Sequence, residues 1–249
     1  MIKKRIDQLL VDKKIAETRT KAKAMVMAGQ IFVNKKNVKK SGEIFAENVN
    51  ICSKGISSEW VSRGAYKLIE AINFFKVSIQ DRVCLDIGAS TGGFTQVLLK
   101  KGARKIYSVD VGKNQLHEKL IKEKKVINIE KQNARYLSSE IIKDKIDVIV
   151  CDVSFISLKK VIEPNMKYLK RNGKIISLIK PQFEADKKEI KKGIVIDASV
   201  HKRICKEYEK WFSNNININV VGTIQSPLKG PKGNIEFLIY CENYKNLKQ

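Results

Sequence analysis

Polar side chains that could do chemistry stand where apolar, strand-like runs of the chain end. Asp86 and Asp110 belong to two consecutive runs around a glycine-rich turn, and Asp152 and Lys180 follow two later runs. Ligands of open α/β sheets bind outside the carboxyl ends of the strands, so these side chains are expected to meet at one edge. Each also has an ordinary explanation, since Asp often caps a helix and Lys is often solvated. Their coincidence predicts a ligand site where carboxylates and an amine lie together.

The glycine-rich turn after the first of these strands carries Gly88, Gly92 and Gly93. Glycines let a backbone approach a ligand, and the helix expected after the turn would direct its N-terminus toward that ligand. The turn lacks the Gly-Lys-Ser/Thr end of a P-loop, and its G-x-x-x-G-G spacing differs from the dinucleotide fingerprint. Asp110, one strand later, is placed to accept ribose hydroxyls. Because carboxylates repel phosphate, we predict a nucleoside cofactor such as S-adenosylmethionine, with a structural turn that binds no ligand as the alternative.

The chain of 249 residues is strongly basic, with 49 Lys and Arg against 26 Asp and Glu and a net charge of +23. This charge favours nucleic acid as a partner, with a lipid surface or a generally lysine-rich composition as alternatives. The five cysteines show no CxxC spacing and lie mostly in apolar runs, which predicts buried thiols, a reducing compartment and no metal site. We find no segment typical of a signal peptide or a membrane span, and therefore expect a cytoplasmic protein without a membrane partner.

Hydrophobic spacing predicts two domains. Residues 1–56 are expected to form a small α+β module, with helices over residues 3–14 and 18–28 followed by a hairpin. Residues 57–63 are the predicted linker, and residues 64–249 form the larger domain. There strands and helices alternate, which predicts an α/β doubly wound, parallel sheet. The expected strands are 83–87, 105–109, 126–129, 146–151, 174–179, 217–225 and 235–241, and the expected helices are 62–75, 94–101, 114–123, 137–143, 157–170 and 199–213.

Three motifs of the first module resemble a known RNA-binding domain. They are Arg5-x-Asp7-x-x-Leu10, Thr18-Arg19-x-x-Ala22 and Ala28-Gly29-x-Ile31-x-Val33-Asn34. They resemble the module named after ribosomal small-subunit protein four, which implies contact with structured RNA through phosphates and shape. Lys35 stands where a glycine is usual in that module, and a solvated basic face is the alternative to RNA binding. The residues expected to bind RNA are Lys4, Arg5, Arg19, Lys21, Lys23, Lys35 and Lys36.

Further motifs carry a resemblance that spans nearly the whole chain. They are Ser62-Arg-Gly-Ala-Tyr-Lys67-Leu, Asp86-Ile-Gly-Ala-Ser-Thr-Gly-Gly-Phe-Thr95, Val109-Asp-Val-Gly, Asn133-Ala-Arg135, Asp152-Val-Ser-Phe-Ile-Ser157, Lys180-Pro-Gln-Phe-Glu184 and Ser226-Pro-Leu-Lys-Gly-Pro-Lys-Gly-Asn-Ile-Glu236. The chain resembles the TlyA family, which is similar to the FtsJ-type ribose methyltransferases. The resemblance implies a Rossmann-like fold, S-adenosyl-L-methionine as cofactor and 2′-O-methylation of cytidines in small- and large-subunit ribosomal RNA. Ribosomal RNA within ribosomal subunits is the implied partner, and members are often labelled haemolysins.

The resemblance also implies which residues act. Its Lys-Asp-Lys-Glu tetrad falls on Lys67, Asp152, Lys180 and Glu236. The expected cofactor residues are Asp86, Gly88, Gly92, Gly93, Asp110 and Asn133. Of these, the Asn is equally well explained as a turn residue. We expect no metal and no obligate protein partner.

The tetrad makes physical sense for methyl transfer to a ribose hydroxyl. That hydroxyl is a poor nucleophile near neutral pH, whereas a sulfonium methyl is already activated, so a base and alignment are the main needs. We expect Lys180 to be the base, because two lysines in one dry pocket depress each other's pKa. Asp152 and Glu236 would position the ammonium groups, and Lys67 would orient the hydroxyl or stabilise the oxyanion.

Other functions remain open from the sequence. A base-directed RNA methyltransferase is the nearest rival, although Asp152-Val-Ser-Phe155 lacks the prolines of the amine-methylase motif. A carbon-5 cytosine methylase would need a cysteine nucleophile, and strand alternation points Cys151 away from the pocket. A ribosome-assembly factor without methyltransferase activity is the alternative from another class, and a direct cytolysin is a further one.

Overall fold

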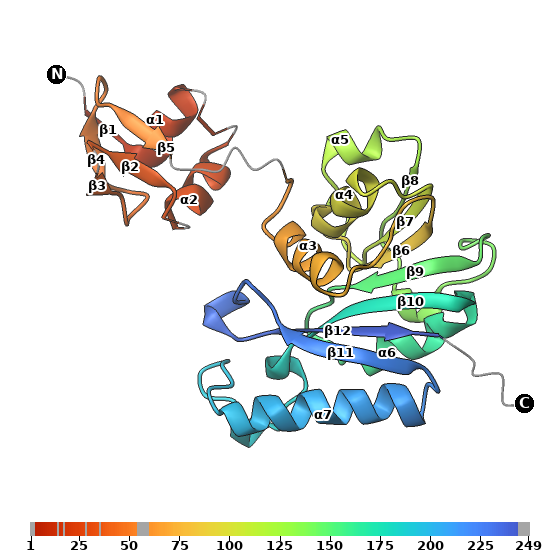
Figure 1. Ribbon diagram of the computed structural model, residues 1–249. Helices are drawn as coiled ribbons and strands as arrows, with labels where there is room; N and C mark the ends of the chain where they lie inside the picture. The colour runs from red at the N-terminus through yellow and green to blue at the C-terminus, as the bar shows by residue number, and fades with distance from the viewer. Residues whose placement is uncertain are drawn as a thin grey trace, which may run out of the picture. The chain divides into compact units, whose positions relative to one another are not determined.

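The computed structural model describes residues 3–13, 15–16, 18–27, 29–34, 36–53 and 60–243. Lys35 and residues 57–59 of the predicted linker therefore lie outside the described residues. The chain divides into two compact units, residues 1–59 and residues 60–249, called here the first unit and the second unit (Figure 1).

The first unit packs two short helices against small antiparallel sheets. The helices meet through buried Ile6, Leu10, Ala22 and Val26. The Thr18 hydroxyl accepts a hydrogen bond from the Lys21 N–H at 3.2 Å, which is the N-cap that the sequence predicts. The elements are β1 (Lys3–Arg5), α1 (Ile6–Asp12), α2 (Arg19–Met27), β2 (Ile31–Val33), β3 (Lys36–Asn37), β4 (Ile44–Ala46) and β5 (Ile51–Ser53), with β1 paired to β4 and the order β3-β2-β5 in the other sheet.

The second unit is built on a seven-stranded sheet in the order β11-β12-β10-β9-β6-β7-β8. Its strands are β6 (Val83–Ile87), β7 (Lys105–Val109), β8 (Val126–Ile129), β9 (Ile146–Cys151), β10 (Leu169–Ile179), β11 (Asn219–Gln225) and β12 (Phe237–Glu242). The pairs among β8, β7, β6, β9 and β10 are parallel, which confirms the predicted α/β architecture. β12 instead runs antiparallel to both neighbours, because only a loop, with no crossover helix, joins it to β11. The sheet is therefore mixed rather than purely parallel.

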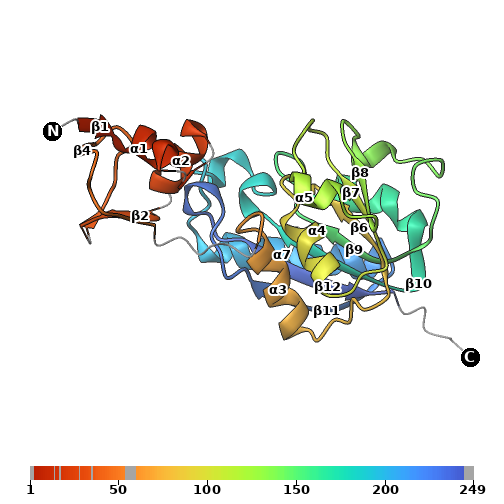
Figure 2. The same cartoon turned by 90° about the horizontal axis from the view of Figure 1, so that it is seen from above.

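Helices cover both faces of this sheet. α3 (Ala65–Phe74), α4 (Gly93–Lys100) and α5 (Glu118–Ile121) share one core cluster, into which β12 points Leu238 and Tyr240. α6 (Lys159–Ile162) and α7 (Ala198–Asn214) share the other, into which β12 points Ile239 and Cys241. Both views show α3 beside α4, and Figure 1 shows α7 along the β11–β12 side of the sheet (Figures 1 and 2). The inner strands β6, β7, β9 and β12 are largely buried on both faces, as their apolar runs predict, whereas the edge strands β11 and β8 are only partly buried.

The helix predicted over residues 3–14 begins only at Ile6, because Lys3–Arg5 form β1. Two predicted helices of the second unit are also wrong. Residues 137–143 form no helix, and only a 3-10 turn, Ala134–Tyr136, precedes them. Leu137 and Ile142 are nevertheless buried in the core, so their apolar spacing reflects burial and not helical geometry. The helix expected over residues 157–170 is split into α6 and a 3-10 segment, Glu163–Tyr168, whose first turn contains a proline.

Candidate active site

Strand register gathers the predicted site residues at one edge of the sheet. Ile87 of β6 is paired with Val109 of β7 and Cys151 of β9, while Ile179 of β10 is paired with Phe237 of β12. Because β12 runs in the opposite direction, the residue before it arrives at the edge where the parallel strands end. The sequence neighbours of these paired residues therefore meet at this edge: Gly88, Asp110, Asp152, Lys180 and Glu236.

The four residues of the expected tetrad contact one another in a continuous chain of ion pairs, and we call them the sheet-edge cluster. Lys180 Nζ lies 2.5 Å from Asp152 Oδ1, and Lys67 Nζ lies 3.5 Å from Asp152 Oδ2. Lys67, in the first turn of α3, also donates to Glu236 Oε2 at 2.7 Å. Amines and carboxylates thus alternate, which is the arrangement that lets charges persist in a largely buried place. The Glu236 side chain is fully buried, and the other three are 8% to 19% exposed.

Three residues that the sequence reasoning missed support the cluster. Lys180 Nζ donates to Ser154 Oγ at 2.9 Å, and Gln182 Nε2 donates to Glu236 Oε1 at 3.3 Å. A Cβ atom at Gly230 would lie 2.0 Å from Glu236 Oε1, so a glycine there leaves the carboxylate its space. All three lie inside motifs that carry the family resemblance, and only that position in the sequence could have indicated their role.

Two neighbouring pockets adjoin the cluster. The larger, of about 410 Å³, extends past the ends of β6, β7 and β9, and the smaller, of about 240 Å³, reaches Lys180. Both are lined by Gly88, Ser90, Asp152 and Ser154. Asp110, Gln132 and Asn133 line the larger pocket, and no Lys, Arg or His is among its described lining residues. A pocket with carboxylates and without cations suits a neutral or cationic nucleoside and disfavours a polyphosphate.

The glycine turn is fitted to its surroundings at Gly88. This residue has a φ of +81°, and a Cβ there would lie 2.6 Å from the carbonyl oxygen of Asp152. Gly93 lines the smaller pocket and also makes room for the start of α3. Gly92 lines neither pocket, and a Cβ there would lie 2.3 Å from Leu120. The three glycines predicted to bind the cofactor therefore have different structural neighbours.

Asp110 and Asn133 both line the larger pocket, where the sequence predicts ribose and adenine. The Asp110 carboxylate accepts backbone N–H groups of Ser90 at 2.8 Å and Gly112 at 2.7 Å. These bonds hold it at the pocket wall, and each oxygen keeps a lone pair for a ligand hydroxyl. The Asn133 side chain accepts from the Arg135 N–H at 3.0 Å and so caps the following turn.

Asp86 lies beneath the turn and lines neither pocket. Its side chain is fully buried, and Thr95 Oγ1 donates to its Oδ2 at 2.6 Å. Its Oδ1 has no hydrogen-bond partner among the described residues. Burial raises the pKa of Asp86 to about 7, which the hydrogen bond from Thr95 partly offsets. Asp86 therefore braces β6 against α4 from below the pocket floor.

Cys151 is a poor candidate for covalent chemistry. Cys84, Cys151 and Cys241 are buried, as the sequence predicts, whereas Cys52 is exposed, against that prediction. Cys151 is fully buried, and burial raises the pKa of its thiol far above neutrality. This disfavours the carbon-5 cytosine methylase among the rival functions. Within the described ranges, no group of three or more His, Cys, Asp or Glu residues is arranged to hold a metal ion.

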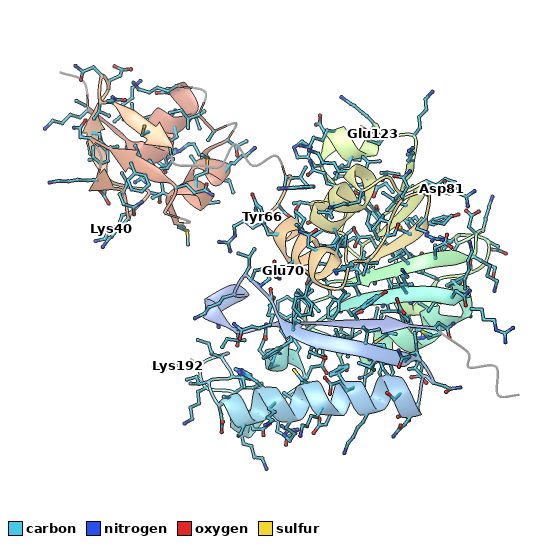
Figure 3. All side chains as sticks on the ribbon, in the orientation of Figure 1. Lys40, Tyr66, Glu70, Asp81, Glu123 and Lys192 are labelled. Carbon is cyan, nitrogen blue, oxygen red and sulfur yellow. The ribbon has the colours of Figure 1, made fainter. Side chains whose placement is uncertain are left out.

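The basic residues of the first unit fall into two kinds. Lys4 is held by two carboxylates, Asp12 at 2.9 Å and Glu47 at 2.8 Å. Arg5 and Arg19 share the buried carboxylate of Asp7. Of the remaining predicted RNA contacts, Lys21, Lys23 and Lys36 are exposed, as is Lys40, which projects from this unit in Figure 3.

Comparison with known proteins agrees with this geometry. Residues 60–243 match the FtsJ-like methyltransferase family, and residues 4–51 match the S4 domain. The chain is 35% identical, over 95% of its length and 88% of the relative's, to the 16S/23S rRNA (cytidine-2'-O)-methyltransferase TlyA of Mycobacterium tuberculosis. The chain belongs to the TlyA family of FtsJ-like methyltransferases.

Other relatives of this TlyA-family chain bear a different kind of name. It is 39% identical to Hemolysin A of Brachyspira hyodysenteriae, over 95% of this chain and 98% of that one. A solved structure from Streptococcus thermophilus, also named a hemolysin, has a TM-score of 0.77 and 39% identity, covering 98% of this chain and 90% of that one. Family membership thus confirms the resemblance drawn from the motifs.

Proposed function

We propose that this chain is an S-adenosyl-L-methionine-dependent ribose 2′-O-methyltransferase that modifies cytidines of ribosomal RNA. The observation that carries the proposal is the sheet-edge cluster, in which Lys180 contacts Asp152 and lines the smaller pocket, while Asp152 lines both pockets. The printed name of the TlyA relative supports the reaction and the substrate class. Small- and large-subunit RNA are both proposed substrates, because that relative's name includes both.

The pocket residues fit S-adenosyl-L-methionine. Asp110 and Asn133 both line the larger pocket, where Asp110 would accept the ribose hydroxyls and Asn133 would lie near the adenine. Gly88 and Gly93 line the smaller pocket, beside Lys180, where the methionine part would be. When bound, this cofactor supplies a methyl group on a positively charged sulfur, and the carboxylate of Asp152, which lines both pockets, matches that charge.

The cluster accounts for proton removal from the attacking hydroxyl. In its neutral form the Lys180 amine would accept the proton of the ribose 2′-hydroxyl, and the bound cofactor would supply the methyl group that this oxygen takes up. Asp152 and Ser154 orient that amine through the contacts described above. Lys67, held by Glu236, carries the positive charge that stabilises the developing oxyanion.

The first unit supplies the contact with RNA in this proposal. Its S4 domain carries exposed lysines and two half-exposed arginines on and near α1 and α2. Such side chains contact phosphates and therefore position an RNA without reading its sequence. RNA affinity is accordingly expected to fall steeply with salt concentration.

Mapping the methyl group tests the proposal. Purified protein is incubated with ribosomal subunits and methyl-labelled S-adenosyl-L-methionine, and the RNA is then hydrolysed with alkali. A 2′-O-methyl group blocks cleavage at its nucleotide, so the label is expected in alkali-resistant dinucleotides that contain cytidine. Label in ordinary mononucleotides would indicate base methylation and overturn the proposal.

Two lysine substitutions, one in β10 and one just after it, distinguish the specific role of the cluster from a general effect of losing a positive charge. Lys180→Ala is expected to lower methyl transfer by about 10³-fold, because the base is lost. Lys174→Ala is the matched control, since Lys174 lies in the middle of β10, away from both pockets, and is 4.0 Å from Glu242. Equal activity of both variants would refute the role of Lys180.

The hemolysin names of two relatives make lysis the second candidate function. Throughout the described residues, no helix is long and apolar enough to cross a membrane. Purified protein, at concentrations that methylate subunits, is expected to release no haemoglobin from erythrocytes. Release that persists in the Lys180→Ala variant would establish lysis as a separate activity.

A further inference from the structure

A sealed carboxylate in the first unit holds two arginines that are themselves open to solvent. Asp7 is fully buried, yet the side chains of Arg5 and Arg19 are 49% and 52% exposed. Arg5 donates from Nε to Asp7 Oδ1 at 3.0 Å and from Nη2 to Oδ2 at 3.1 Å. Arg19 donates from Nη2 to the same Oδ2 at 3.1 Å. The two guanidinium groups are therefore anchored to one carboxylate and lie next to each other.

The local backbone fixes this carboxylate. Asp7 lies in the first turn of α1, whose first N–H groups bond to the turn just before β4. Ile6 donates to the Glu43 carbonyl at 2.7 Å, and Asp7 donates to that of Ser41 at 3.2 Å. A Cβ at Gly42 would lie 3.3 Å from Arg5 Nη2, so a glycine there leaves the guanidinium its room. Hydrogen bonds, from Arg5 foremost, hold the pKa of Asp7 at about 2 despite burial. The carboxylate therefore stays charged at physiological pH.

The arrangement leaves most of the guanidinium donors available. A guanidinium has five N–H groups. Within the described part of the first unit, Asp7 takes two from Arg5 and one from Arg19. Two positive charges against one negative charge leave this group cationic. Planar N–H forks match the oxygens of a phosphate, which accept bidentate bonds.

Lys4 shows what the same unit does with a cation that is neutralised. Its ammonium group lies between the carboxylates of Asp12 and Glu47, so negative charge is in excess there. A lysine also lacks the planar fork. The two arginines consequently differ from their basic neighbour in charge balance, in donor geometry and in exposure.

We infer that Asp7 is a positioning residue that holds Arg5 and Arg19 as one phosphate-binding site for an RNA backbone, which we call the arginine fork. This inference rests on the proposed function only in taking RNA as the ligand. Preorganisation matters here because the entropy of ordering two long side chains is lost on folding and not again on binding. Asp7 thus raises affinity for an anion although it is itself negative.

Because Asp7 is negative, simple electrostatics predicts that its removal strengthens RNA binding, whereas the inference predicts weaker binding. The full-length chain can therefore test the inference. The probe is end-labelled ribosomal RNA extracted from purified ribosomal subunits, and binding is measured by filter retention without cofactor. Asp7→Asn is expected to weaken binding about fivefold, because the fork loses its charged anchor. Asp12→Asn is the matched control, which removes one negative charge from the same unit and is expected to bind equally or slightly more tightly. Equal or tighter binding by Asp7→Asn would overturn the inference.

A second pair of variants keeps the test decisive if Asp7→Asn fails to fold, as circular dichroism would show. Arg5→Lys and Arg19→Lys preserve charge at half-exposed positions and remove the fork, so each is expected to weaken binding about threefold. Lys23→Arg is their control on the exposed side of α2 and is expected to change nothing. Wild-type affinity in both arginine variants would refute the fork. Because no methyl transfer is measured, these results are independent of the alkali test of the proposed function.

Discussion

The sheet-edge cluster and the arginine fork use the same motif, a carboxylate between two cations, in opposite surroundings. In the cluster the lysine side chains are 8% and 11% exposed and the bridging carboxylate is 19% exposed. In the fork the carboxylate is sealed and the cations are about half exposed. The cluster therefore keeps its cations largely buried, with Lys180 lining the smaller pocket, and the fork leaves its cations half exposed to solvent.

The type of cation explains what each arrangement is suited for. A lysine amine can lose its proton and so act as a base, whereas a guanidinium stays charged at any physiological pH. A guanidinium in turn offers a planar fork to phosphate oxygens, which an ammonium group does not. The comparison teaches that a bridging carboxylate organises cations in both places, and that the cation decides between proton transfer and anion binding.

Replacing a lysine of the cluster by arginine, the cation of the fork, is expected to have the largest effect. Lys180→Arg keeps the positive charge beside Asp152 but removes the group that accepts the hydroxyl proton. Methyl transfer is expected to fall by about 10³-fold in kcat. Single-turnover methylation of ribosomal subunits measures this, and isothermal titration with S-adenosylhomocysteine checks that the pocket still binds. Activity within tenfold of the unsubstituted enzyme would show that the cluster does not need a lysine for proton transfer, and would contradict the comparison.

Removing the far carboxylate of the cluster is expected to cost less. Glu236→Gln leaves the Lys67 ammonium near Asp152 alone, and a neutral amide holds an ammonium less firmly. We expect kcat to fall about 10- to 100-fold, as when a supporting partner of a functional group is lost. RNA affinity, measured by filter retention, should not change, since the fork lies in the other unit. A loss of affinity without a loss of kcat would contradict the assignment.

A carboxylate held by backbone N–H groups alone extends the comparison. Asp110→Ala removes the acceptor expected for the ribose hydroxyls of the cofactor, while Ser90 and Gly112 lose only a turn contact. Affinity for S-adenosylhomocysteine is expected to fall about tenfold, which titration calorimetry measures. An unchanged dissociation constant would place the ribose elsewhere. Asp81→Ala, at an exposed aspartate away from both pockets, is the control.

Asp86 is a buried carboxylate with no cation beside it in the described part of the chain, and it gives the last prediction. The pKa of Asp86 is raised from 3.8 to about 7, so the folded state binds its proton more tightly than the unfolded state does. This stabilisation is complete below pH 3.8 and is lost as pH rises through 7. Without cofactor, the unsubstituted protein should therefore lose unfolding free energy between pH 5 and pH 8. Asp86→Asn should lose less, by on the order of 2 kcal/mol. Urea denaturation at both pH values measures it, and parallel pH profiles would contradict the account.

Sequence reasoning located the sheet edge because strand ends are visible as apolar runs that stop at polar residues. Asp110, Asp152 and Lys180 follow directly from that pattern. Lys67 and Glu236 came from the family resemblance, since nothing in local spacing shows that a helix before the sheet and the start of an antiparallel strand meet there. The direction of β12 and the absence of a helix over residues 137–143 depend on packing, which a hydrophobic pattern does not encode.

The first unit shows a similar limit. Seven of its basic residues were expected to bind RNA, with no distinction between paired and unpaired side chains, because a sequence shows charge but not pairing. Only the packing of α1 against α2 brings Arg19 to Asp7, and only the fold shows that Lys4 is neutralised by Asp12 and Glu47. Whether a lysine or arginine is available to a partner is therefore a tertiary property.

The bond between Lys67 and Glu236 joins residues 169 positions apart. During synthesis, almost the whole second unit must leave the exit tunnel before these two side chains can meet. A nascent chain that stops short of β12 would have most of the strands, but its Lys67 ammonium group would lack the Glu236 carboxylate and have only Asp152 beside it. We therefore expect truncated products to be inert, so that completion of translation itself switches the enzyme on.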